Sequence, residues 1–151
     1  GSSMETFNLY QDLILDYARS NKGRGRVEQP TGTGAGRVAS CGDRSLVTVR
    51  VENSIVTEAK VDCDGCAISL ASAAMLVETV EGRTLTDAKA AVEHAIAVFR
   101  GEAEFSSDDA FAPLGGIHKH PSRLKCASLS WHAMLAALEE SEALPRYRAF
   151  R

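Results

Sequence analysis

The chain has 151 residues, and its 17 lysines and arginines against 20 aspartates and glutamates give a formal charge of −3. The acidic balance argues against a general nucleic-acid binder, and the longest uncharged stretch, within residues 65–77, is too short to span a bilayer. A chain of this length buries roughly 68–70% of its unfolded surface as one domain, so stability alone requires neither a disulfide nor a metal. We expect a tag remnant at residues 1–3 and one cytoplasmic domain over residues 4–151, without nucleic-acid or membrane partners.

The N-terminal part is predicted to contain one helix and one loop. Apolar residues recur at helical spacing over residues 7–19, from Tyr10 to Tyr17. Residues 22–37 are rich in glycine and carry several basic side chains, which favours a flexible connection. The basic charge there either docks an acidic partner or simply faces solvent.

Strands are predicted next, from alternation of apolar and polar residues. Residues 47–51 and 55–63 alternate in this way, and residues 52–54 form a short hairpin-like connection between them. A further strand is expected around residues 36–40. These segments indicate an antiparallel sheet of about three strands.

Helices dominate the second half of the chain. They are predicted over residues 66–80, over residues 86–100 behind a capping residue at Thr84, and over residues 123–140. Residues 101–122 read as irregular. Early strands and late helices predict an α+β fold, in which helices cover a small antiparallel sheet.

Four cysteines are the residues that point most directly to chemistry. In a cytoplasmic chain they are more typical of metal binding or reactivity than of disulfides. Cys41 lies in a predicted turn, Cys66 at a helix start and Cys126 in the first turn of the last helix. A helix N-terminus lowers a thiol pKa and favours the thiolate. Each cysteine alone also fits a buried small hydrophobic residue.

A metal site is the interpretation that unites three of these thiols. Cys41, Cys66 and Cys126 would bind with Asp43 as an oxygen ligand. Zinc accepts such a tetrahedral set, and iron–sulfur clusters also take thiolates. A carboxylate anchors a metal less firmly than a fourth thiolate, so such a site is able to exchange a ligand.

Cys63 opens a different possibility, because Cys63-x-x-Cys66 is the spacing of a dithiol redox pair. Strand periodicity instead points Cys63 inward, as a buried neighbour of the site. A zinc deaminase is excluded, since no histidine is followed by x-Glu. His118 and His120 are candidate ligands that also fit exposed loop residues.

Four segments together match one known family. They are LYQDLILD at 9–16, CGD at 41–43, DGCAISLASA at 64–73 and RLKCASLSW at 123–131. With these segments in this order, the chain resembles the SufU-type members of the IscU/NifU-like iron–sulfur cluster assembly proteins, over roughly residues 7–140. Lys125 before the last cysteine and the segment 101–122 are similar to SufU rather than to IscU.

The resemblance implies a function, a ligand set and partners. SufU-like proteins bind zinc through residues that correspond here to Cys41, Asp43, Cys66 and Cys126. They take persulfide sulfur from a pyridoxal-phosphate cysteine desulfurase of SufS type and relay it to the downstream iron–sulfur assembly machinery, as a zinc-dependent sulfurtransferase does. The family is also described as cluster scaffolds, and both roles stay open, as do a structural-zinc binding module and a dithiol redox protein.

We expect the residues of the site to have different roles. Cys41 lies on a turn beside Gly42, so we expect it to be the mobile sulfur acceptor. Asp43 would hold zinc while Cys41 is away. Arg123 and Lys125 flank Cys126, where they either stabilise thiolate charge or face solvent.

Overall fold

The computed structural model describes the backbone of residues 2–149 and the side chains of residues 11–144. Gly1 of the predicted tag remnant and the side chain of Tyr10 lie outside these described residues. Within the described part, no helix combines the length and the apolar character needed to cross a membrane. In chain order the elements are α1 (Ser2–Arg19), β1 (Gly32–Val38), β2 (Asp43–Glu52), β3 (Ile55–Asp64), α2 (Ala67–Val80), α3 (Leu85–Phe99), the 3₁₀ helices η1 (Ala112–Leu114) and η2 (Ile117–Lys119), and α4 (Pro121–Ala149).

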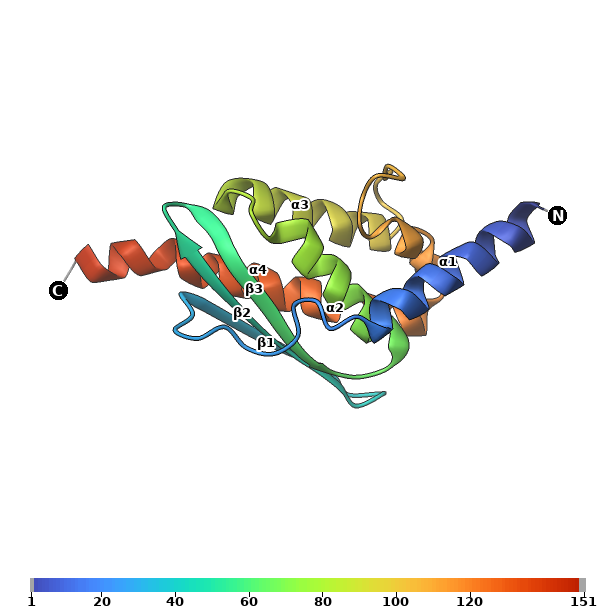
Figure 1. The fold of residues 1–151 in the computed structure, drawn as a ribbon, viewed down its shortest axis with the longest axis horizontal. Coiled ribbons are helices and arrows are strands. Elements are labelled where there is room, and N and C mark those ends of the chain that lie inside the picture. The colour runs from blue at the N-terminus through green and yellow to red at the C-terminus, as the bar shows by residue number, and fades with distance from the viewer. Residues whose placement is uncertain (1, 150–151) are drawn as a thin grey trace.

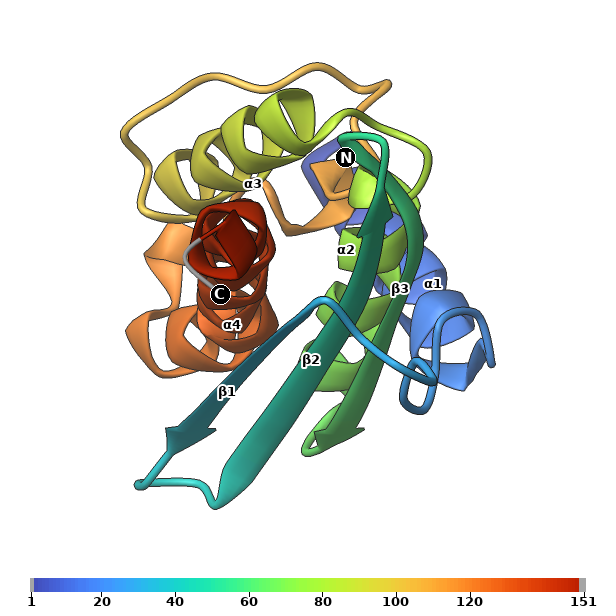
Figure 2. The ribbon, with the colours of Figure 1, turned by 90° about the vertical axis from the view of Figure 1, so that its left-hand side faces the viewer.

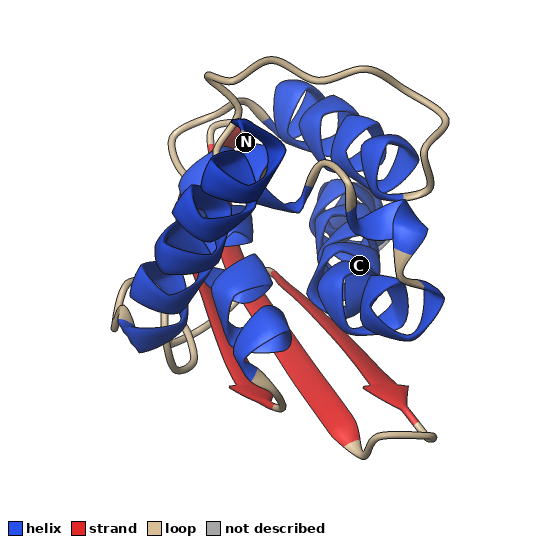
Figure 3. Cartoon of the chain, turned by 90° about the vertical axis from the view of Figure 1, so that its right-hand side faces the viewer, coloured by secondary structure: helices blue, strands red, loops and turns tan. Residues whose placement is uncertain are grey.

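The three strands form one antiparallel sheet in the order β1-β2-β3, and the helices gather on one of its faces (Figures 1 and 3). The predicted α+β class is therefore confirmed. The hairpin between β2 and β3 closes at the pair Glu52 and Ile55. Asn53 and Ser54 between them have φ of 52° and 64°, as a two-residue turn that follows the right-handed twist of the strands requires.

The glycine-rich segment differs from the prediction. The sequence predicts a flexible connection over residues 22–37, but their second half belongs to strand β1, Gly32–Val38, which begins earlier than the strand predicted around 36–40. A Cβ on Gly32 or Gly34 would overlap backbone carbonyl oxygens of α4. The absence of side chains thus lets α4 lie directly on β1, at the edge of the sheet (Figure 2).

The long helices of the second half follow the prediction closely, except that the last one is longer at both ends, and the segment 101–122, predicted to be irregular, contains η1 and η2. The Thr84 side chain accepts a hydrogen bond from the Asp87 backbone N–H at 3.1 Å, so the predicted cap of α3 is confirmed. Helix α4 begins at Pro121, two residues before the predicted 123–140, and runs to Ala149. Proline is favoured at the first position of a helix, where its missing N–H costs nothing.

The core is centred on three aromatic rings. Trp131 meets Phe99 and Phe111 edge to face, with ring centroids 5.4 and 5.6 Å apart. The fully buried Trp131 also donates its indole N–H to Ser72 of α2 at 2.7 Å. This cluster ties α4 to α2 and α3, so α4 has a fixed position above the sheet.

Candidate metal centre

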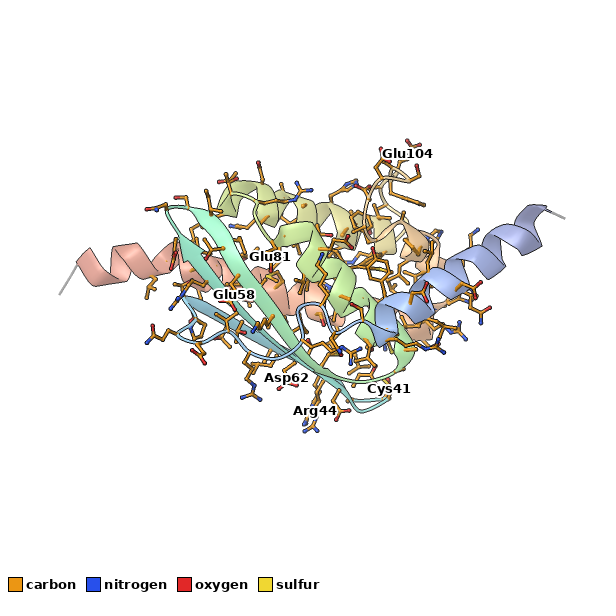
Figure 4. All side chains as sticks on the ribbon, in the orientation of Figure 1. Cys41, Arg44, Glu58, Asp62, Glu81 and Glu104 are labelled. Carbon is orange, nitrogen blue, oxygen red and sulfur yellow. The ribbon has the colours of Figure 1, made fainter. Side chains whose placement is uncertain are left out.

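Cys41 lies at the tip of the hairpin that joins β1 to β2. Val38 and Asp43 close this hairpin as a cross-strand pair, and Gly42 donates its N–H to the Val38 carbonyl at 2.9 Å. Gly42 has a φ of 75°, a conformation that favours glycine. Cys41 is exposed at this end of the sheet (Figure 4). The predicted turn is confirmed, and it leaves this thiol open to other molecules.

Asp43 is a buried carboxylate supplied with hydrogen-bond donors. It is only 5% exposed, and the Ser69 hydroxyl donates to its Oδ2 at 2.5 Å. Burial alone raises its pKa. Hydrogen bonds from Ser69, from the Cys126 and Cys41 thiols and from the Cys66 backbone N–H outweigh burial, so the pKa of Asp43 is lowered. The carboxylate is therefore held ionised, the form that binds metals.

Cys126 is placed differently from the sequence prediction. Because α4 begins at Pro121, Cys126 lies in the second turn and not in the first, and its Sγ lies 3.7 Å from the Ser122 carbonyl oxygen. Burial raises the pKa of this thiol, and its hydrogen bonds to Asp43 and Cys41 raise it further. The prediction that the start of the helix lowers the pKa of the Cys126 thiol is therefore wrong. A bound cation would have to favour its thiolate.

The structure brings three of the four predicted ligands together. The ligand atoms of Cys41, Asp43 and Cys126 all lie within 4.8 Å of one another. The two thiol sulfurs are 3.7 Å apart. Two sulfurs bound tetrahedrally at the usual Zn–S length of about 2.3 Å are separated by about 3.8 Å. The donor set and its spacing therefore fit zinc.

Cys66, the fourth predicted ligand, adjoins this group without joining it. It is the N-cap of α2, as predicted, and is exposed. Its backbone N–H bonds Asp43, but its Sγ lies 3.6 Å from the Ser69 hydroxyl. A Cβ on Gly65 would come within 2.8 Å of the Asp43 Cγ, so only glycine lets the chain pass this close to the carboxylate.

Ser69 is the residue of the site that sequence reasoning missed. It is 1% exposed, and its hydroxyl contacts Asp43, the Cys66 sulfur and the Cys126 carbonyl. In the sequence it is one of many small residues of α2, which indicate close packing only. Nothing in that pattern distinguishes a packing serine from one that orients a carboxylate.

Cys63 is half-buried and packs against the core, in agreement with its predicted inward direction. Burial, followed by the negative charge of Asp43, raises the pKa of Cys63 to about 11. A redox-active Cys-x-x-Cys pair needs a lowered thiol pKa. This environment disfavours the dithiol interpretation.

The other predicted neighbours lie on the surface. Arg123 and Lys125 are exposed on the first turns of α4, and neither side chain has a hydrogen bond or ion pair to a thiol within the described residues. His118 and His120, at the end of η2, are also exposed and lie outside the cysteine and aspartate group.

Comparison with known proteins agrees with this fold and this group of residues. Residues 9–145 match the NifU-like N-terminal domain family. The chain belongs to this family. Among its relatives, the "iron-sulfur cluster assembly scaffold protein IscU" of Thermotoga maritima is 34% identical over 134 residues, which cover 87% of this chain and 94% of that protein. The "zinc-dependent sulfurtransferase SufU" of Bacillus subtilis is 29% identical, over 89% of this chain and 92% of that protein.

A solved structure shares the fold of this NifU-like chain. The crystal structure of a putative iron-sulfur cluster assembly scaffold protein for the SUF system from Fervidobacterium islandicum superposes with a TM-score of 0.76 and 28% identity. The match covers 91% of this chain and 99% of that one. The resemblance to IscU and SufU is confirmed, and the chain is a member of this iron–sulfur cluster assembly family.

Proposed function

We propose that this NifU-like chain is a zinc-dependent sulfur acceptor of SufU type. Cys41 takes persulfide sulfur from a pyridoxal-phosphate cysteine desulfurase and relays it to cluster assembly. One observation carries the proposal: Cys41 is exposed on a turn, whereas Asp43 and Cys126 beside it are buried. One ligand of the group is thus free to leave while two stay in place.

The zinc would be held by Cys41, Asp43, Cys66 and Cys126. When bound, zinc keeps its thiol ligands as thiolates at neutral pH. Cys66 completes the set after rotation of its side chain away from Ser69. Asp43 stays ionised because the Ser69 hydroxyl and the Cys66 backbone N–H donate hydrogen bonds to its carboxylate, so it remains able to hold the metal when Cys41 departs.

The transfer itself needs no external oxidant. The Cys41 thiolate attacks the outer sulfur of the donor persulfide, and a new S–S bond forms on Cys41. The S–S bond of the donor breaks, and the donor cysteine leaves as a thiolate that takes up a proton. The outer sulfur passes from one thiol to another, and the number of S–S bonds is unchanged.

A sulfur-acceptance assay tests the role of Cys41. The purified chain is incubated with a cysteine desulfurase and cysteine, and the persulfide on each thiol is located by mass spectrometry after alkylation. We expect Cys41→Ser to abolish acceptance. The matched control Cys63→Ser should retain it, because Cys63 lies outside the ligand group. Undiminished acceptance by Cys41→Ser would refute the assignment.

Elemental analysis tests the metal. Protein purified without oxygen or added metal should hold nearly stoichiometric zinc, and Asp43→Ala should hold less. Absence of metal from both proteins would contradict the zinc site and favour thiol redox chemistry.

A cluster scaffold built on the same thiolates is the second candidate. The relative from Thermotoga maritima, named as a scaffold, favours it. Iron together with acid-labile sulfide in the anaerobic preparation would support this role over sulfur relay.

A further inference from the structure

Strand β1 is an edge of the sheet, and a groove runs beside it. In the order β1-β2-β3 one side of β1 pairs with β2, and no strand of the described chain pairs with the other side. A groove of about 660 Å³ lies there, between the C-terminal half of β1 with its turn and residues 125–133 of α4. The residues that line it are Ala35, Gly36, Arg37, Val38, Ala39, Ser40, Lys125, Ser128, Leu129, His132 and Ala133.

The charge of this β1–α4 groove is one-sided. Arg37 and Lys125 line it, and no acidic residue does so among the residues described. Neither cation has an ion pair within residues 11–144, where five other basic side chains do. The groove therefore presents two unpaired cations, although the chain as a whole has more acidic than basic residues.

The pairing of β1 with β2 places a second positive charge beside Arg37. Arg37 of β1 lies directly opposite Arg44 of β2, and like charges in that position repel. Arg44 pairs with Asp64 at 3.3 Å, whereas Arg37 has no ion pair within the described residues, because the two carboxylates that share a hollow with it, Asp62 and Asp64, already pair with Arg26 and Arg44. Figure 4 shows Arg44 at the same end of the sheet as Cys41. An anionic group beside Arg37 would relieve the repulsion.

Each wall of the groove contains a residue that is the chain neighbour of a candidate metal ligand. Ser40 directly precedes Cys41, and Lys125 directly precedes Cys126. Most of its walls are small residues, which leave the main chain of β1 within reach. A segment lying along β1 would therefore end next to the exposed thiol.

We propose that the β1–α4 groove binds an extended, acidic segment of a partner protein, which adds to the sheet as a fourth strand beside β1. Main-chain hydrogen bonds to the free edge supply affinity, and side chains supply specificity. Gly36 faces α4, since a Cβ there would meet Leu129 at 2.8 Å, so Arg37 lies on the opposite face of the strand. Two consecutive acidic residues of the segment, which point to opposite faces, reach Arg37 and Lys125.

The proposal deepens the proposed function, because the segment would belong to a protein that exchanges sulfur or a cluster at Cys41. Peptide binding is measured without any sulfur transfer, so the binding proposal and the proposed sulfur-acceptor function can fail independently of each other. The competing explanation for Arg37 is protection of the edge, since a charge on an edge strand discourages pairing with a second copy.

The test uses the full chain labelled with ¹⁵N and the peptide acetyl-TVEEVT-amide, with acetyl-TVKKVT-amide as the charge control. We expect saturable amide shifts in β1 and slower hydrogen exchange at its edge with the acidic peptide alone, weakening as salt is added. Arg37→Glu should weaken binding about tenfold. The matched charge reversal Arg19→Glu, at the exposed end of α1, should leave binding unchanged.

Each other outcome overturns the proposal. Shifts without added protection of β1 amides mean a charged patch and not strand addition. Equal binding of both peptides removes the acidic specificity. Tighter binding of a single-stranded oligonucleotide at the same amides assigns the groove to nucleic acid. Self-association of the free chain that increases in Arg37→Glu assigns Arg37 to edge protection. Zinc content is measured on the same samples as a control for the metal centre, and we expect Arg37→Glu and Arg19→Glu to hold as much zinc as the wild type.

Discussion

Replacement of Gly34 by alanine should break the packing between β1 and α4. The added Cβ would overlap the Ala133 carbonyl oxygen and come within 3.1 Å of the Ala137 backbone nitrogen. These are backbone atoms inside a helix, so they cannot rotate aside as a side chain would. Accommodation requires α4 to move away from the strand.

The magnitude follows from this rigidity. Overpacking of a well-packed interior typically costs about 1–3 kcal/mol, and a collision with fixed backbone takes the upper value. We expect a loss of about 3 kcal/mol, against a total stability of about 5–15 kcal/mol for an ordinary domain. With a urea slope of about 2 kcal/mol per molar, the unfolding midpoint falls by about 1.5 M.

Urea unfolding of the wild type, of Gly34→Ala and of Gly116→Ala decides the point. A Cβ on Gly116 meets nothing within 4 Å and its φ is −98°. Alanine there should leave stability unchanged or raise it by up to about 1 kcal/mol, through the unfolded state. A Gly34→Ala protein as stable as the Gly116→Ala control would refute the argument that β1 needs glycine for close approach.

Three further changes test other parts of the fold. Burial and the hydrogen bond to Glu78 raise the pKa of Tyr17 from 10.0 to about 12. This stabilisation is complete below pH 10 and lost as pH rises toward 12, so urea midpoints in that range should fall more steeply for the wild type than for Tyr17→Phe. Ser72→Ala leaves the buried Trp131 indole N–H without its partner and should cost about 1–3 kcal/mol, seen in unfolding followed by tryptophan fluorescence. Thr84→Ala removes the cap of α3 and should cost about 1 kcal/mol in thermal unfolding.

Controls and contrary results are specific to each change. Ser128→Ala is matched to Ser72→Ala, because its hydroxyl only back-bonds the Leu124 carbonyl within α4, and it should stay within about 0.5 kcal/mol of the wild type. Equal losses for both serines would contradict a special role of Ser72. Parallel alkaline profiles would contradict the raised Tyr17 pKa, and an unchanged melting temperature would show that Thr84 does not cap.

The alternation of apolar and polar residues predicted β2 and β3, whereas it did not predict the first half of β1, for a physical reason. Glycine has low strand propensity and no side chain to alternate, so Gly32–Val38 reads as a loop until α4 is in place. The start of α4, in contrast, could have been predicted from the sequence. Proline is favoured at the first position of a helix, and a helix that starts at Pro121 has Cys126 in its second turn.

Only part of the candidate site could be predicted from the sequence. Cys41, Asp43 and Cys126 follow from the chemistry of their side chains and from the family resemblance, and the structure brings them together. The Cys66 thiol contacts the Ser69 hydroxyl and lies outside the group of three, which its position in the sequence does not reveal. A hydroxyl buried between helices has the same sequence signature whether it packs or orients a ligand, so Ser69 emerges only in three dimensions.

The placement of two thiols on different layers has a consequence for folding itself. Cys41 belongs to the sheet hairpin and Cys126 to α4, 85 positions later in the chain. A metal held by both would join these layers as a removable cross-link, and its binding free energy would add to that of folding. The chain would then be most tightly closed when loaded, and after each departure of Cys41 from the metal the link between sheet and helix would rest on Asp43 of β2 and Cys126 of α4.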